Sequence, residues 1–249
     1  MLAGIVCPRV MSDDPFQRSQ LDYYDQSAEQ YESGDGIQRT LNRAFERKAR
    51  ILMKSLGVGP WDVVLEVGAG SGLLTWFMAQ RLRFARYLAL DLSQGMLDLA
   101  RKRLAGKTSL EFVRADAART GLPSDLATAV IGCDIIHHLE FPENALREWY
   151  RLARPGARLA ILETNPKNPL HWRFIGVEHE VRSWLNTDTN LKRWTEAAGW
   201  RDVRVEPAEV FTPAGPKGFG WALDLLDSIS LCVPGWRRLS AMWIITAVK

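Results

Sequence analysis

The chain has 249 residues, of which 47% are hydrophobic and 24% charged, a composition ordinary for one globular domain with a sizeable core. The formal net charge is only +3, and its basic residues are scattered, so composition gives no indication of nucleic-acid binding. The three cysteines, Cys7, Cys133 and Cys232, lie far apart without metal-ligand spacing, which argues against a metal site and favours a reducing, cytoplasmic location. No apolar run reaches the roughly 18 residues of a membrane span.

The first part of the chain predicts a helical segment ahead of the main domain. Residues 1–20 are interpreted as a lead without signal-peptide features, and residues 21–57 as helical. A modest basic group at residues 43–50 is interpreted as a solvated helix face. We therefore expect residues 1–57 to form an N-terminal helical lid on a core of residues 58–249.

Short apolar runs then alternate with amphipathic ones. The predicted strands are residues 62–67, 87–92, 110–114, 127–133 and 158–163. The predicted helices are residues 73–82, 94–104 and 143–152. Residues 154–156 are expected to form a turn. Such alternation implies parallel strands joined by right-handed crossovers, with helices on both faces of the sheet.

After Thr164 the pattern changes. Residues 187–199 predict a helix, and residues 201–210 and 240–248 predict two further strands. Two segments, residues 165–186 and 211–236, are expected to form insertions that cap a substrate pocket. The predicted fold is thus α/β: a doubly wound, mostly parallel seven-stranded sheet with an antiparallel C-terminal edge strand, similar to a Rossmann fold.

The sequence VVLEVGAGSG, residues 63–72, carries the strongest functional signal. A strand runs directly into glycines and then into a helix, which is typical of a loop that receives a nucleotide-like ligand. The dinucleotide pattern GxGxxG would need glycine where Leu73 stands. Glu66 would repel a pyrophosphate, whereas it could organise the loop or attract an ammonium group.

This segment resembles the E/DxGxGxG motif of class I methyltransferases that depend on S-adenosylmethionine (SAM), and the resemblance extends over about residues 22–164. It is nearest to the branch with ubiquinone/menaquinone-type and natural-product methyltransferases. The resemblance implies SAM as the cofactor and a loop against its methionine part. The loop residues that it assigns to cofactor binding are Glu66, Gly68, Ala69, Gly70 and Gly72.

Further cofactor contacts are expected where later strands end. Asp91 ends the second predicted strand, where a carboxylate can accept hydrogen bonds from both ribose hydroxyls, although a helix cap would explain it too. The resemblance adds contacts at the positions Leu92, Met96, Asp116, Ala117, Cys133 and Tyr31. Met96 as a core residue, Asp116 as a turn residue and Tyr31 as a helix-packing residue are the alternatives.

His137 and His138 are the candidate catalytic residues. They stand in an HHL sequence after the fourth predicted strand, and histidine can accept a proton near neutral pH. In the family that this motif resembles, it often orders the site without acting as a base, so both roles are open. Glu163 or His171 could orient an acceptor hydroxyl or amine.

The acceptor is expected to be a small, apolar molecule, methylated on O, N or C, of the natural-product, quinone or lipid type. The apolar face of residues 211–236 supports this expectation, although the same helix could lie on a membrane surface. An RNA methyltransferase, a non-catalytic SAM-binding protein and an NAD(P)-dependent oxidoreductase are the alternatives. The sequence predicts neither a nucleic-acid partner nor an oligomeric state.

Overall fold

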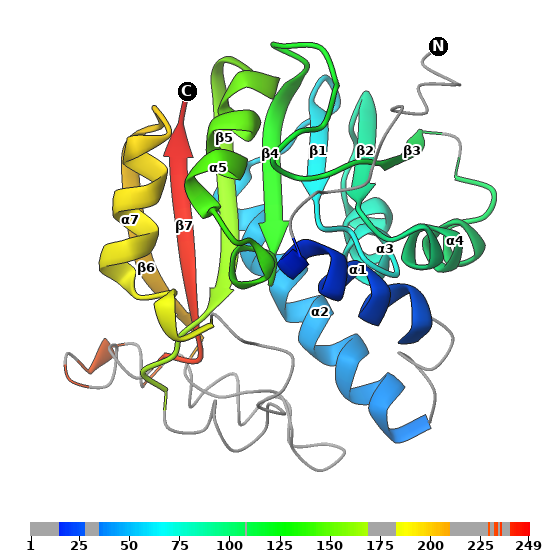
Figure 1. The fold of residues 1–249 in the computed structure, drawn as a ribbon, viewed down its shortest axis with the longest axis horizontal. Helices are drawn as coiled ribbons and strands as arrows, with labels where there is room; N and C mark the ends of the chain where they lie inside the picture. Colours follow the sequence, from blue (N-terminus) through cyan, green and yellow to red (C-terminus); the bar gives the residue numbers. More distant parts are fainter. Residues whose placement is uncertain are drawn as a thin grey trace.

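The computed structural model describes residues 15–27, 35–107, 109–168, 183–209 and 240–249, together with residues 229, 232, 233 and 235. A seven-stranded sheet in the order β3-β2-β1-β4-β5-β7-β6 forms its centre (Figure 1). Across these ranges, no helix is both long and apolar enough to cross a membrane.

The strands are β1 (Val63–Val67), β2 (Arg86–Asp91), β3 (Leu110–Arg114), β4 (Ala127–Cys133), β5 (Ala153–Thr164), β6 (Arg201–Glu209) and β7 (Met242–Val248). The helices are α1 (Pro15–Ser27), α2 (Asp35–Leu56), α3 (Leu73–Arg81), α4 (Gln94–Arg103), α5 (Pro142–Leu152) and α7 (Asp188–Ala197). Two short 3-10 helices are η1 (Ile136–His138) and η2 (Ser183–Leu185).

The predicted fold class is confirmed. Strands β3, β2, β1, β4 and β5 pair in parallel, and β7 pairs antiparallel with both β5 and β6. The antiparallel pairing therefore lies at the C-terminal side of the sheet, as expected, but β7 stands between β5 and β6 and leaves β6 outermost.

Three sequence expectations need correction or fall outside the described ranges. Helix α1 begins at Pro15, inside the expected lead, because proline suits the first turn of a helix. Residues 154–156 belong to β5 and bulge out: between the paired positions, β4 advances from 127 to 129 while β5 advances from 153 to 158. The predicted helix 211–236 lies outside the described residues, apart from four isolated positions.

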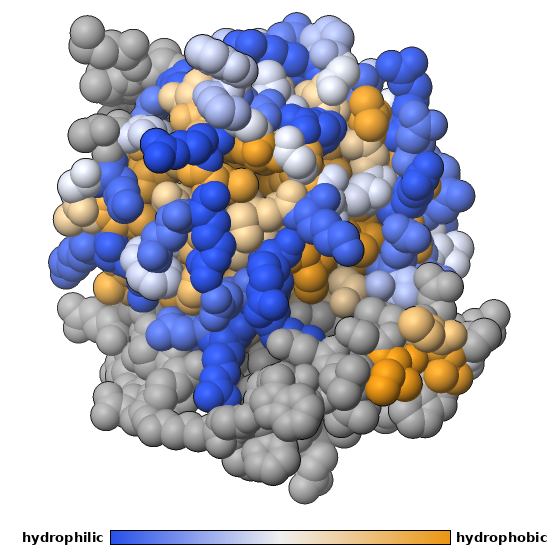
Figure 2. Space-filling view, turned by 180° about the vertical axis from the view of Figure 1, so that it is seen from behind, coloured by the Kyte–Doolittle hydropathy of each residue, from blue (hydrophilic) through white to orange (hydrophobic). Residues whose placement is uncertain are grey.

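Helices cover both faces of the sheet. On one face α5 and α7 bury apolar side chains, among them Trp149 and Trp194, against the strands. On the other face α2 and α3 do so through residues such as Leu52 and Phe77. Figure 1 shows α5 and α7 in front of the sheet. Seen from behind, polar side chains cross the surface in columns with apolar residues between them (Figure 2).

Gly72 fixes the junction between the glycine loop and α3. Its φ angle is +75°, and a Cβ added there would lie 2.7 Å from the Cβ of Ala100 on α4. A side chain at this position therefore combines a left-handed backbone with a steric clash. The close approach of α4 to the loop depends on this glycine.

We expect Gly72→Ala to lower the free energy of unfolding by about 2–4 kcal/mol, measured by urea denaturation. Gly106→Ala is the matched control, because Gly106 has a φ of +83° but open space around its added Cβ. The control should lose about 1 kcal/mol from backbone strain alone. Equal losses in the two variants would show that helix packing at Gly72 contributes nothing.

Candidate active site

The candidate site lies at the edge of the sheet where β1, β2 and β4 have their carboxyl ends, the usual ligand position in open α/β folds. Figure 1 shows α1 lying across this edge, near the carboxyl end of β4. Side chains from three parts of the chain meet here: the glycine loop after β1, the strand ends of β2 and β4, and the N-terminal helices.

The glycine loop is tied to β2 and leaves one glycine open. The N–H groups of Gly68 and Ala69 both donate to the carbonyl of Leu90, at 2.9 Å each. A Cβ at Gly68 would lie 2.7 Å from Ile135, whereas a Cβ at Gly70 would meet nothing within 4 Å. The loop is therefore tightly packed at Gly68 and unobstructed at Gly70. A ligand can approach the backbone of Gly70 closely.

Glu66 is enclosed beneath this loop. It is 1% exposed, and one carboxylate oxygen accepts hydrogen bonds from Thr75 Oγ1 at 2.6 Å and Tyr87 Oη at 2.7 Å. Burial, which outweighs these two bonds, raises the pKa of Glu66 to about 7. Of the two roles left open by the sequence, this geometry favours organisation of the loop, through contacts to α3 and β2.

Asp91 joins the loop to the start of α4. Its Oδ2 accepts a hydrogen bond from Gly70 N at 2.7 Å, and its Oδ1 accepts one from Ser93 N at 2.9 Å. Burial raises the pKa of Asp91, and nearby Asp25 adds to the effect. Because each carboxylate oxygen has two acceptor sites, both oxygens can still receive a ligand hydroxyl.

Asp25 of α1 is a residue that the sequence analysis missed. Its Oδ1 accepts a hydrogen bond from Gly95 N at 3.1 Å and another from the hydroxyl of Ser93, which itself caps α4. An acid on a separate helix thus binds the N-terminus of α4. No local pattern reveals such a contact, because it depends on how α1 folds over the sheet edge.

The remaining predicted cofactor residues differ in exposure. Leu92 is half-buried beside Asp91, whereas the side chain of Met96 is buried in the core. Asp116 accepts a hydrogen bond from Ala118 N at 2.8 Å, which is a turn contact, and the carbonyl of Ala117 accepts one from the indole of Trp149. Tyr31 lies outside the described residues.

The end of β4 carries an ion pair. Asp134 has a φ of +52° and pairs with Lys48 of α2, whose side chain is only 15% exposed. The solvated helix face expected for this basic group is therefore wrong for Lys48. Cys133 is buried next to the pair, and burial, with Asp134 beside it, raises the pKa of its thiol.

The carboxylate of Glu163, near the end of β5, contacts residues 135–137 at the start of the HHL segment. Its Oε1 accepts hydrogen bonds from Ile135 N and Ile136 N, at 2.7 and 2.6 Å. Its Oε2 lies 2.9 Å from His137 Nδ1 and 2.8 Å from Asn186 Nδ2. All four acceptor sites of this fully buried carboxylate are used, so the expected contact of Glu163 with an acceptor is wrong.

His138 faces α1. Its Nε2 lies 3.2 Å from the hydroxyl of Tyr24, and its Nδ1 lies 3.0 Å from Gln20 Oε1. Burial, together with neighbouring His137, holds the pKa of His138 well below its usual value. The imidazole is therefore neutral at physiological pH, the form that can accept a proton.

Most predicted site residues thus lie along one sheet edge: the glycine loop, Asp91, Cys133 and the two histidines. Asp25, Lys48, Tyr24 and Gln20 were missed or given no definite role, and all four come from α1 or α2. In the portion of the chain that the structure describes, no group of three or more His, Cys, Asp or Glu residues could hold a metal ion.

A mostly parallel sheet with a glycine loop after β1 and an acid ending β2 is the arrangement with which open α/β folds bind nucleotide-type ligands. The family model described as a methyltransferase domain matches residues 65–161. By this match the chain is similar to class I SAM-dependent methyltransferases over the central part of its sheet.

Curated relatives agree with this class. The chain is 29% identical over 164 residues to a demethylmenaquinone methyltransferase of Clavibacter sepedonicus, which covers 56% of the chain and 66% of the relative. It is 34% identical over 129 residues to the ubiquinone/menaquinone biosynthesis C-methyltransferase UbiE of Ectopseudomonas mendocina, covering 49% of each. The matches thus span about half to two thirds of these relatives.

Solved structures share the fold. A methyltransferase from Haloferax volcanii, solved in complex with the activator Trm112, is similar with a TM-score of 0.65 and 18% identity, covering 96% of this chain and 99% of that one. A SAM-dependent methyltransferase from Thermotoga maritima, described as a possible histamine N-methyltransferase, gives a TM-score of 0.63 at 17% identity, covering 92% and 99%. At such identities the likeness concerns the fold alone.

Proposed function

We propose that this protein transfers a methyl group from SAM to an O, N or C atom of a small, apolar molecule. The observation that carries the proposal is the meeting, at one sheet edge, of an open glycine loop bound to Asp91 and the pair of His137 and His138 after β4. The glycine loop and Asp91 are proposed to bind the cofactor. The histidine pair is proposed to border the position where the methyl group is transferred to the acceptor.

The residues present fit SAM. Gly70 offers unobstructed backbone beside the loop, and the two oxygens of Asp91 keep acceptor capacity for the ribose hydroxyls. Leu92 lies next to Asp91 on the same strand end, where an apolar side chain suits the adenine. The segment around Asp116 and Ala117 follows the neighbouring strand β3 and completes this proposed cofactor half.

When bound, SAM supplies an electrophilic methyl group on a good leaving group, so the protein has mainly to position, desolvate and deprotonate the acceptor. His138 is proposed to take this proton because its imidazole is neutral and its Nε2 lies against Tyr24, while its lowered pKa makes it a weaker base than an ordinary histidine. His137 is held by Glu163 and acts as the support for the segment. An acceptor would have to displace the Tyr24 contact to reach Nε2.

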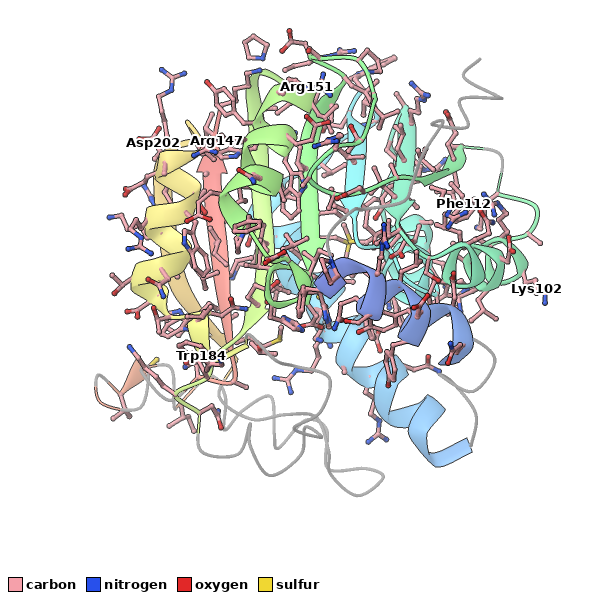
Figure 3. The ribbon with its side chains drawn as sticks, viewed as in Figure 1. Lys102, Phe112, Arg147, Arg151, Trp184 and Asp202 are labelled. Carbon is pink, nitrogen blue, oxygen red and sulfur yellow. The ribbon has the colours of Figure 1, made fainter. Side chains whose placement is uncertain are left out.

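Helices α1 and α2 are proposed as a lid on this site. Helix α1 reaches both halves, through Asp25 at α4 and through Tyr24 at His138, so its position controls entry to each. An apolar acceptor is further supported by Trp184 at the carboxyl edge, which is 59% exposed and labelled in Figure 3. Exposed Ile229 and Val233 belong to the segment proposed to cap the pocket or lie on a membrane.

Isothermal titration with SAM tests the proposal. We expect the wild-type protein to bind SAM, and Gly70→Ala to bind at least about tenfold more weakly, because the new methyl group occupies the open face of the loop. Gly156→Ala is the matched control: Gly156 also has a positive φ and open space, but it lies in the bulge of β5. The control should bind like wild type.

Titration with NAD(H) and a methyl-transfer assay separate the alternatives. Binding of NAD(H) in place of SAM would overturn the proposal. Binding of SAM without transfer to any apolar phenol, amine or quinol would leave only a SAM-binding protein. Transfer to RNA, and to none of these small molecules, would replace the proposed acceptor class.

A further inference from the structure

One oxygen at the end of β4 has no partner although it is buried. Asp134 Oδ1 has no contact with solvent and receives no hydrogen bond from the residues that the structure describes, while Oδ2 of the same carboxylate pairs with Lys48. An ionised oxygen without a donor is costly in a protein interior. Such an atom in a candidate site indicates that a ligand supplies the missing donor.

The carboxyl group of Asp134 is ionised at neutral pH in the folded protein. Burial raises the pKa of Asp134, but Lys48, His137 and His138 together outweigh this effect and leave the pKa below its usual value. The neighbouring thiol of Cys133 points at Oδ2, at 3.7 Å, and not at Oδ1. The unpaired oxygen therefore carries negative charge and calls for a donor rather than for a second acceptor.

The position of Asp134 Oδ1 favours a role in the acceptor half of the site, which is the part around His137 and His138 after β4. The N–H of Asp134 donates to the carbonyl of Leu162 on β5, and His137 and His138 are among the groups that lower the pKa of its carboxyl group, which places that group beside the histidine pair. Two other buried polar atoms without partners, Thr164 Oγ1 and Trp243 Nε1, occur at the same end of β5 and β7. In the cofactor half, by contrast, Asp91 already has two backbone donors.

The backbone holds this oxygen in place at a cost. A φ of +52° is unfavourable for residues other than glycine, although Asp and Asn tolerate it best. Lys48 fixes Oδ2 from α2, with its ammonium group 4.9 Å from the centroid of the Phe45 ring. Strain at a ligand-facing turn is typical of functional positions.

We propose that Asp134 Oδ1 accepts a hydrogen bond from a hydroxyl or amine group of the acceptor molecule and that Lys48 is the positioning residue that aims it. The inference rests on the proposed function and narrows it to acceptors with a hydrogen-bond donor near the methylated atom. Such an acceptor would bind with its polar group toward β4 and its apolar part toward the carboxyl end of β5 and the adjacent amino end of β7. Its entry requires α1 to move from His138, since Tyr24 and Gln20 occupy that side.

The test compares two probes that differ only in the donor: 1-naphthol and 1-methoxynaphthalene. Their binding is measured by titration with and without S-adenosylhomocysteine. We expect the wild-type protein to bind the naphthol at least about tenfold more tightly, as for one hydrogen bond to a charged group. Asp134→Asn should abolish this preference, because asparagine keeps the left-handed backbone but turns an amide N–H₂ toward the ligand.

Lys48 is tested in the same way. Lys48→Met should lose the preference for 1-naphthol and Lys48→Arg should recover it, since arginine can again pair with Oδ2. Lys54→Met, an exposed lysine on the same helix, is the matched control and should behave like wild type. Affinity for S-adenosylhomocysteine should stay within about twofold in all these variants.

Three outcomes overturn the inference: equal binding of both probes by the wild type, binding of neither, or weakened binding of S-adenosylhomocysteine by Asp134→Asn. The last would mean that the oxygen serves the ammonium group of the cofactor. Failure of the wild type to bind S-adenosylhomocysteine would contradict the proposed function instead. The naphthol comparison without that ligand still decides the role of Asp134.

Discussion

Glu163→Ala is expected to lower the free energy of unfolding by at least about 4 kcal/mol. The substitution leaves four donors without an acceptor: the N–H groups of Ile135 and Ile136, His137 Nδ1 and Asn186 Nδ2. Glu163 is fully buried, so water cannot replace the carboxylate without a cavity, and each buried donor left unpaired costs about 1–3 kcal/mol. Urea denaturation at neutral pH measures the loss.

Glu163→Gln keeps the test measurable, because a loss of 4 kcal/mol approaches the stability of many domains. The one remaining oxygen can serve the two fixed backbone N–H groups, while the His137 ring takes the other tautomer and the Asn186 amide turns. We expect this variant to lose about 1–3 kcal/mol. A loss from Glu163→Ala no larger than that from Glu163→Gln would contradict the account.

Glu148→Ala is the matched control. Glu148 also accepts four hydrogen bonds, two from Thr120 and two from Arg151, which lies at the opposite edge of the sheet (Figure 3). Its side chain is partly exposed, so water can take over part of these bonds. Its loss should be less than half of that caused by Glu163→Ala.

The residues proposed to bind the cofactor could be named from the sequence because they are local to their strands. A glycine loop after an apolar strand and an acid at the next strand end occupy positions that the parallel sheet itself brings together. The sheet order of β6 and β7 was less accessible, because two consecutive strands can pair in either order with β5. Their register depends on tertiary packing rather than on either sequence alone.

The acceptor half could be predicted only in part. His137 and His138 stand out as a motif, but nothing near them in the chain indicates that Glu163 holds one and that α1 holds the other. Lys48 resembled a solvated lysine, since its partner is 86 residues away. Long-range pairs of this kind follow from how α1 and α2 pack on the sheet, and single-sequence patterns do not encode that packing.

Glu66→Gln is expected to remove a pH dependence of stability that the wild-type protein shows. The carboxyl group of Glu66 lies under the glycine loop, where the hydroxyls of Thr75 and Tyr87 donate to it. Its pKa is raised by burial to about 7, whereas an ordinary glutamate has a value of 4.5. A glutamine can accept the same two hydrogen bonds through its carbonyl oxygen and carries no charge at any pH.

The sign follows from which state binds the proton. Below pH 4.5 the group is protonated in both the folded and the unfolded chain, and burial carries no charge penalty. Between pH 4.5 and about 7 the unfolded chain releases the proton while the folded chain keeps it, so stability falls as the pH rises. Above about 7 the full difference applies, which corresponds to about 3 kcal/mol for the separation of the two pKa values.

Urea denaturation of both proteins from pH 5 to pH 8.5 measures this contribution as the difference between wild type and Glu66→Gln, in which most other titrating groups cancel. We expect the variant to gain most of about 3 kcal/mol relative to wild type across this range. Glu206→Gln, at an exposed glutamate on β6, should give a difference that hardly changes with pH. A constant difference for Glu66→Gln as well would mean that the buried carboxyl is already ionised at pH 5. In that case Thr75 and Tyr87 would have to stabilise the charge far more than two hydroxyl donors ordinarily do. The Glu66 carboxylate beneath the glycine loop would then be ionised over the whole pH range tested.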